Sequence, residues 1–273
     1  MKIQKISHPT NFKSGLNQKI IAESKAIIPS VAEAEILNLS GVNAKFSDFK
    51  VNAYCVKKAI EIFKLLNKKI GLGLFKTEAP NIRTYVDEDL VFPFTGYGFC
   101  VPESRRVLRN EQPFETGSIF YYQENFIESL DAKSDFDYKN KKTSSSHFLA
   151  PIFHEMFHER YLNHILKKYG YNGLCPYTRE KYPPKFTEIG GWEKLREMES
   201  LSLDDSENEI VKNVLGSYST EDKNQYHEVF AETFTKLVCD TLSENLVPQR
   251  NPLDDLKRYP KEFLQIFNKV LKI

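Results

Sequence analysis

Cysteine is scarce in this sequence: four occur in 273 residues, namely Cys55, Cys100, Cys175 and Cys239. No two of them form a C-x-x-C pair, which argues against a thiolate zinc site or a redox motif. A chain of this length does not need a disulfide framework to fold. We therefore expect four scattered, reduced thiols.

The sequence also lacks an excess of charge of either sign, with 38 Lys and Arg residues against 37 Asp and Glu residues. The resulting net charge of +1 gives no global attraction to nucleic acid or to acidic membranes. The short basic run at residues 139–142 is interpreted as a solvated loop. We therefore expect no nucleic-acid partner.

Long apolar runs are missing as well. No stretch of about 18 apolar residues occurs, so we expect no membrane span. The opening residues contain no apolar segment typical of a Sec-type signal peptide. These absences predict a soluble protein that stays in the cytoplasm, or that is secreted or delivered into a host cell without such a signal.

What the sequence does contain is enough apolar material for a sizeable core, with 41% hydrophobic residues. Residues 1–45 are polar and mixed, and they are interpreted as an N-terminal extension. Apolar residues at helical spacing predict an amphipathic helix over residues 51–69. Three runs rich in β-branched and aromatic residues then predict strands at residues 82–86, 96–101 and 118–122.

Helices dominate the predictions for the C-terminal half. The polar residues 131–146 predict a loop, in which Ser144–Ser146 are candidate helix caps. A strong helix is predicted over residues 147–169, and further helices are predicted at residues 190–214, 226–242 and 261 to the end. The order of these elements indicates an α+β fold in which a mixed sheet packs on helices.

A metal-binding pattern lies inside the predicted helix 147–169. His154 and His158 belong to the motif H-E-x-x-H, and their spacing of four residues places them on one helical face, within reach of one ion. Zinc accepts neutral imidazole readily and keeps an open position in hydrolytic sites. Glu155 can take a proton from zinc-bound water and later donate it to the leaving amine.

One candidate for the third metal ligand is His164. Its spacing from His158 is that of the metzincin signature, but Tyr161 stands where that signature has glycine. Without the glycine the segment is predicted to continue as a helix, which carries His164 about 9 Å further along and onto another face. This alternative is therefore the weaker one.

The other candidate is Glu228, which lies on the predicted helix 226–242. Glu228 and Glu232 are four residues apart and share a face of that helix. Glu228 would complete a site of two His and one Glu with water in the fourth position. Glu232 could accept a hydrogen bond from a ligand imidazole and fix its tautomer.

Two segments give the sequence a resemblance to a known family. The H-E-x-x-H motif followed by residues 228–234 (Glu-Val-Phe-Ala-Glu-Thr-Phe) resembles the anthrax lethal factor family, whose corresponding helix reads E-F-F-A-E-x-F and which includes secreted Pro-Pro endopeptidases. Residues 259–269 are similar to the terminal P-x-x-F-x-F-I-N helix of that family. The resemblance covers roughly residues 150–273.

The resemblance implies a zincin-like gluzincin fold over residues 46–273, with an upper subdomain at about 46–165 and a lower helical subdomain at about 166–273. It also implies that a Tyr in a Ser-Tyr context stabilises the oxyanion. Tyr218 fits that context, although it lies farther from Glu228 than in the family, and Tyr226 is the reserve candidate. Substrates of such proteases extend along an edge strand, for which residues 118–122 are the candidate.

These observations together predict a monomeric endopeptidase that uses one zinc ion to hydrolyse a protein or peptide substrate. Its metal ligands would be His154, His158 and Glu228, and its catalytic residues Glu155 and Tyr218. Delivery as a toxin or effector into another cell would change only its destination. The alternatives are a metzincin-type peptidase with His164 as third ligand, and a non-catalytic metal-binding protein that acts through protein–protein interaction.

Overall fold

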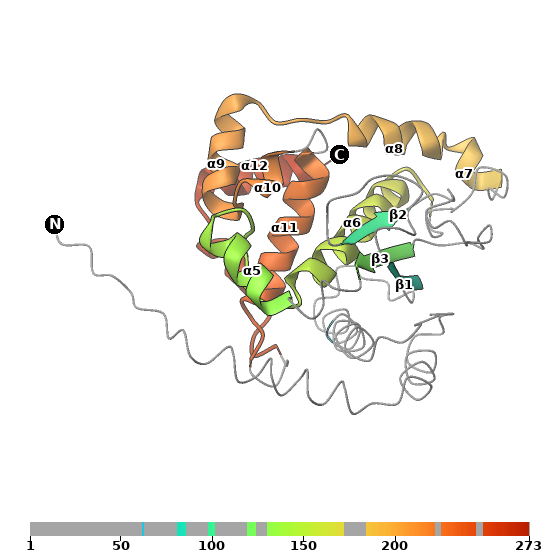
Figure 1. Cartoon of the computed structure of the whole chain (residues 1–273). Coiled ribbons are helices and arrows are strands. Elements are labelled where there is room, and N and C mark those ends of the chain that lie inside the picture. Colours follow the sequence, from blue (N-terminus) through green and yellow to red (C-terminus); the bar gives the residue numbers. More distant parts are fainter. Residues whose placement is uncertain are drawn as a thin grey trace, which may run out of the picture.

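The computed structural model of the chain describes residue 62 and seven longer segments, which are residues 81–85, 98–101, 119–123, 130–171, 184–221, 225–243 and 248–272. Figure 1 shows these segments as ribbons. The predicted N-terminal extension, residues 1–45, lies outside them. So does the predicted helix at residues 51–69, except for Ile62, which is helical and buried.

Helices make up most of the described chain. They are α5 (Leu130–Lys139), α6 (Ala150–Lys168), α7 (Pro184–Glu188), α8 (Gly191–Glu199), α9 (Asp205–Leu215), α10 (Tyr218–Glu221), α11 (Gln225–Cys239), the 3-10 helix η3 (Pro252–Arg258) and α12 (Lys261–Leu271). The helices predicted at residues 147–169, 226–242 and 261 to the end are confirmed as α6, α11 and α12. None of the described helices is long and apolar enough to cross a membrane.

The expected fold class, an α+β fold built on a mixed twisted sheet, is wrong for the described residues, which are predominantly helical. The strands β1 (Asn81–Tyr85), β2 (Gly98–Val101) and β3 (Ile119–Gln123) are short and form one small sheet beside α6 (Figure 1). The buried residues that the structure describes on the helices and the segments between them form one hydrophobic cluster. Aromatic and β-branched runs indicate where strands form, but they do not determine how much of the fold the sheet supplies.

Two local predictions are also corrected. The stretch expected as a loop contains helix α5, because charged residues at a spacing of four, such as Asp135 and Lys139, can pair along a helix even without an apolar face. The strand order is β1-β3-β2, so β3 pairs on both sides. The run at residues 118–122 is therefore a central strand of the described sheet and not the expected edge strand for a substrate.

The helix pair α6 and α11 forms the centre of the described structure (Figure 1). Twelve of the fifteen residues of α11 are buried, so other elements surround it on nearly all sides. Phe157 stacks on Phe234 with ring centroids 5.3 Å apart, and Tyr161 stacks on Phe230 at 4.7 Å. As the residue numbers rise along α6 they fall along α11, so the two helices run antiparallel. These aromatic pairs fix the rotation of each helix about its axis.

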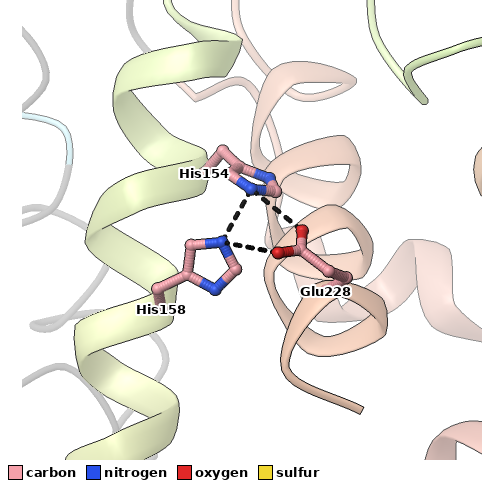
Figure 2. Close-up of side chains that lie close together, drawn as sticks. All are labelled: His154, His158 and Glu228. Atoms are coloured by element: carbon pink, nitrogen blue, oxygen red, sulfur yellow. Dashed lines mark hydrogen bonds and ion pairs between the residues drawn. The ribbon is translucent and has the colours of Figure 1, made fainter. Parts of the chain in front are cut away.

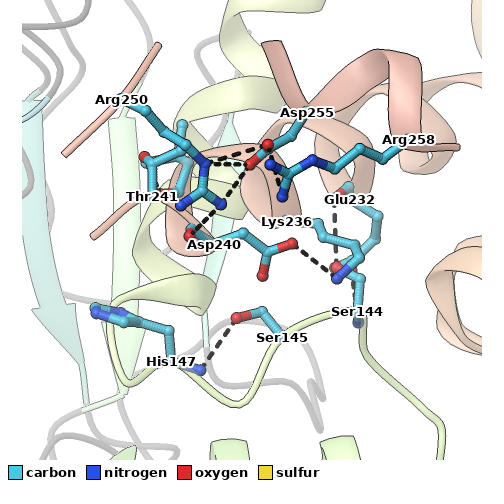
Figure 3. A network of polar contacts seen from close by, with 11 residues as sticks. Ser144, Ser145, His147, Glu232, Lys236, Asp240, Thr241, Arg250, Asp255 and Arg258 are labelled. Atoms are coloured by element: carbon cyan, nitrogen blue, oxygen red, sulfur yellow. Dashed lines mark hydrogen bonds and ion pairs between the residues drawn. The ribbon is translucent and has the colours of Figure 1, made fainter. Parts of the chain in front are cut away.

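A charged network anchors the end of α11 to the segment that follows it (Figure 3). The buried carboxylate of Asp255 accepts hydrogen bonds from Arg250 Nε at 2.9 Å and Nη2 at 2.6 Å, and Arg258 Nη1 lies 3.1 Å away. Arg250 also donates to the backbone oxygen of Asp240, directly after α11. The two guanidinium groups offset the cost of burying the charge of Asp255. The network thereby connects η3 to the end of α11.

Candidate metal centre

The side chains of His154, His158 and Glu228 converge between α6 and α11 (Figure 2). The Nε2 atoms of the two histidines are 2.7 Å apart. Glu228 Oε2 lies 3.2 Å from His154 Nε2, and Glu228 Oε1 lies 3.4 Å from His158 Nε2. All three residues are buried, and a ligand atom of each lies within 4.8 Å of the other two.

This donor set fits a zinc ion. Bonds of about 2.0–2.1 Å in a tetrahedral site place neighbouring ligand atoms about 3.3 Å apart. The distances from the two oxygens of Glu228 to the histidines match this spacing, whereas the two histidine Nε2 atoms, 2.7 Å apart, lie closer together than that. Two imidazoles and a carboxylate are ligands that zinc uses in catalytic sites, with a fourth position left open. In the part of the chain that the structure describes, no second group of three such ligands is found.

Glu232 contacts Nδ1 of His154, the ring nitrogen that does not face the metal position. It lies one helical turn after Glu228, and its Oε1 is 2.8 Å from His154 Nδ1. A carboxylate there accepts a hydrogen bond from Nδ1–H, and in the neutral imidazole this leaves the Nε2 lone pair directed at the metal position. The other oxygen of Glu232 accepts hydrogen bonds from Ser144 Oγ at 2.6 Å and Ser144 N at 3.1 Å (Figure 3).

The two histidines differ in their affinity for protons. Burial alone would lower the pKa of His154, but hydrogen bonds to Glu228 and Glu232 outweigh it and raise this pKa well above its ordinary value. Burial and the neighbouring histidines His227 and His154 lower the pKa of His158 well below its ordinary value. The metal-free site at neutral pH therefore carries its proton on His154 and leaves His158 neutral.

This asymmetry predicts how many protons zinc displaces. We expect zinc binding at pH 7 to release about one proton, from His154, because a metal ligand must give up its proton. His158 contributes none, since its lowered pKa leaves it neutral already. Calorimetric titrations with zinc in buffers of different ionisation enthalpy measure this number. Glu232→Gln removes a charge that raises the pKa of His154 and should reduce the release; equal release from both proteins would contradict the assignment.

Glu155 and His164 occupy different positions on α6. Glu155 is buried and follows His154 directly on α6. Helix α6 continues without interruption through His164, whose Nε2 lies 3.3 Å from the backbone oxygen of Leu271 in α12. His164 is not part of the converging group, so the structure does not bring the metzincin-type ligand to the metal position.

The two tyrosine candidates also differ in position. The ring of Tyr218 lies 5.5 Å from the ring of His154 and is 42% exposed, so it stands at the solvent side of the site. Tyr226 is buried, and its ring lies 5.7 Å from Lys269 Nζ. Of the two, the structure places only Tyr218 next to a predicted metal ligand.

Sequence analysis missed two residues at this site. His227 lies against His158 with ring centroids 4.1 Å apart, and its Nε2 is 3.1 Å from the backbone oxygen of His158. Ser144 was interpreted as a helix cap, but α6 begins at Ala150 and has no side-chain cap. The position of His227 directly before Glu228 was a usable signal, whereas nothing local distinguishes Ser144 from its two neighbours.

Comparison of the chain with protein-family models, curated proteins and solved structures finds no match. The resemblance to the lethal factor family therefore stays a prediction that rests on the motifs alone.

Proposed function

We propose that this chain is an endopeptidase that uses one zinc ion to hydrolyse peptide bonds. The convergence of His154, His158 and Glu228 on one point, in a buried setting, is the observation that supports the proposal most. The buried carboxylate of Glu155, next to His154 in sequence, and the exposed phenol of Tyr218 would supply the further groups that hydrolysis needs. The motif resemblance favours a peptide bond over other hydrolysable bonds.

The side chains would share the reaction as follows. His154, His158 and Glu228 would hold the metal, and Glu232 would keep His154 in the tautomer that leaves Nε2 free. Zinc, when bound, supplies a Lewis acid and lowers the pKa of a bound water to about 7. Glu155 would accept the proton of the attacking water and transfer it to the leaving amine. Tyr218 would donate a hydrogen bond to the developing oxyanion.

The direct test is cleavage of a mixture of unfolded proteins. The full chain is incubated with a denatured proteome after chelation and again after zinc is restored, and the new N-termini are sequenced. We expect new termini only in the zinc-restored sample, at bonds that share residue preferences. Zinc binding without new termini would overturn the proposal and favour a protein that acts by binding.

Loss of the Tyr218 hydroxyl is expected to slow cleavage by about 10²- to 10³-fold, because one oxyanion donor typically contributes that much. Tyr218→Phe should leave zinc affinity unchanged, since the hydroxyl is not among the predicted ligands. Tyr226→Phe is the matched control, because that ring is buried and lies beside Lys269 of α12. Initial rates on one cleaved peptide measure both variants; a large loss only in Tyr226→Phe would exchange the two roles.

A further inference from the structure

The segment of residues 141–144, between α5 and α6, contacts two other parts of the site. At its end, Ser144 makes three hydrogen bonds to Glu232: Oγ to Oε2 at 2.6 Å, the backbone N to Oε2 at 3.1 Å, and Oγ to the backbone oxygen at 3.3 Å (Figure 3). Ser144 and Glu232 are both buried. Because Glu232 holds His154 through its other oxygen, Ser144 acts on the predicted metal ligand through one intermediate residue.

The beginning of the same segment holds the turn that carries Tyr218. The backbone oxygen of Lys141 accepts a hydrogen bond from Ser217 N at 2.8 Å, and that of Lys142 accepts one from Tyr218 N at 2.9 Å. The turn follows α9, whose C-cap residue is Gly216 with φ of +100°. A side chain there would be strained and would bring Cβ within 2.5 Å of the Lys142 oxygen. Gly216 thus permits the close approach of the two segments.

We propose that the 141–144 segment is a positioning element that holds both the Glu232–His154 pair and the Tyr218 turn. Ser144 is then a positioning residue for the metal centre, and Gly216 affects metal affinity although it touches no ligand. The inference rests on the metal centre of the proposed function, but not on the peptidase activity. No other described contact of Glu232 Oε2 replaces Ser144.

The geometry explains why the serine matters. A carboxylate that holds a ligand imidazole is fixed only if its second oxygen is also held, since otherwise it rotates about its last torsion. Ser144 supplies two donors to that oxygen, one from the side chain and one from the backbone. Removal of the hydroxyl leaves a buried, charged oxygen with one donor, which is costly and loosens Glu232. The serine is free for this role because α6 begins six residues later.

The first test is zinc affinity measured by competition with a chromophoric chelator. Ser144→Ala should bind zinc about 3- to 10-fold more weakly, less than the roughly 10- to 100-fold typical when a ligand's direct partner is lost. Ser144→Thr keeps the hydroxyl and should restore most of the affinity. Ser145→Ala is the matched control, because this buried neighbour accepts a hydrogen bond from His147 N and makes no described contact with Glu232. Ser144→Ala with parental affinity would overturn the role of Ser144.

The second test addresses the shared segment. Gly216→Ala should weaken zinc binding to a similar degree as Ser144→Ala, and the double variant should lose less than the product of the two single losses, because both act through one segment. Ser217→Pro removes the backbone donor to Lys141 together with the hydroxyl that donates to Glu221, and it replaces Gly216→Ala if that variant does not fold. Ser217→Ala, which loses only the hydroxyl, is its control. Parental zinc affinity in the folded variant would overturn the shared role.

The outcomes also separate this inference from the proposed function. A parent chain that binds no zinc would overturn both. A parent chain that binds zinc but cleaves nothing would overturn the peptidase proposal alone, while the affinities of the Ser144 and Gly216 variants would still decide the role of the 141–144 segment.

Discussion

Replacement of Glu155 with glutamine is expected to reduce cleavage by about 10²- to 10⁴-fold while zinc stays bound. A general base contributes rate factors of that order, and the amide of glutamine keeps the shape of the side chain but accepts no proton at neutral pH. Glu155 is buried on α6, directly after His154 in sequence, and it is not one of the three converging ligands. Its loss should therefore affect the rate and not the metal content.

Initial rates and zinc content, measured on the same preparation, check this expectation. Glu209→Gln removes a carboxylate from an exposed position on α9 and is the matched control, which should cleave at the parental rate. A Glu155→Gln protein that cleaves as fast as the parent would end the proposed mechanism. Loss of zinc in that variant would instead assign Glu155 a role in metal binding.

Local sequence patterns predicted the parts of the site that depend on helical periodicity. The spacing of His154 and His158 on one helix, and of Glu228 and Glu232 on another, follows from 3.6 residues per turn. The structure brings all four side chains together at the antiparallel contact of α6 and α11. The contact itself depends on aromatic pairs between the helices, such as Phe157 with Phe234, whose partners no local pattern specifies.

The predictions failed where contacts between residues far apart in the sequence determine the structure. Ser144 bonds to a residue 88 positions later, and its local setting indicated only a cap. The strand at residues 119–123 is central because strands before it in sequence pair on both of its sides, and pairing order is not encoded within a strand. Helix α5 was missed because a polar stretch without an apolar face gives no periodic signal.

Substitution of Glu228 with alanine should reduce zinc affinity by more than the roughly 10- to 100-fold typical for loss of an outer partner, because a ligand itself is removed. Both of its carboxylate oxygens face the histidines, Oε2 at 3.2 Å from His154 Nε2 and Oε1 at 3.4 Å from His158 Nε2. Alanine leaves two imidazoles 2.7 Å apart without a charge to offset a cation in a buried site. Metal analysis after dialysis and chelator competition measure the loss.

His164→Ala gives the matched comparison, because His164 is the alternative third ligand and lies on the same helix as the first two. Its Nε2 contacts the backbone oxygen of Leu271, so its removal should leave zinc affinity at the parental value. The pair of variants therefore distinguishes the two ligand sets by opposite results. If Glu228→Ala kept its zinc and His164→Ala lost it, α6 would have to unwind near Tyr161 to bring His164 to the metal, and the antiparallel helix pair would no longer explain the site.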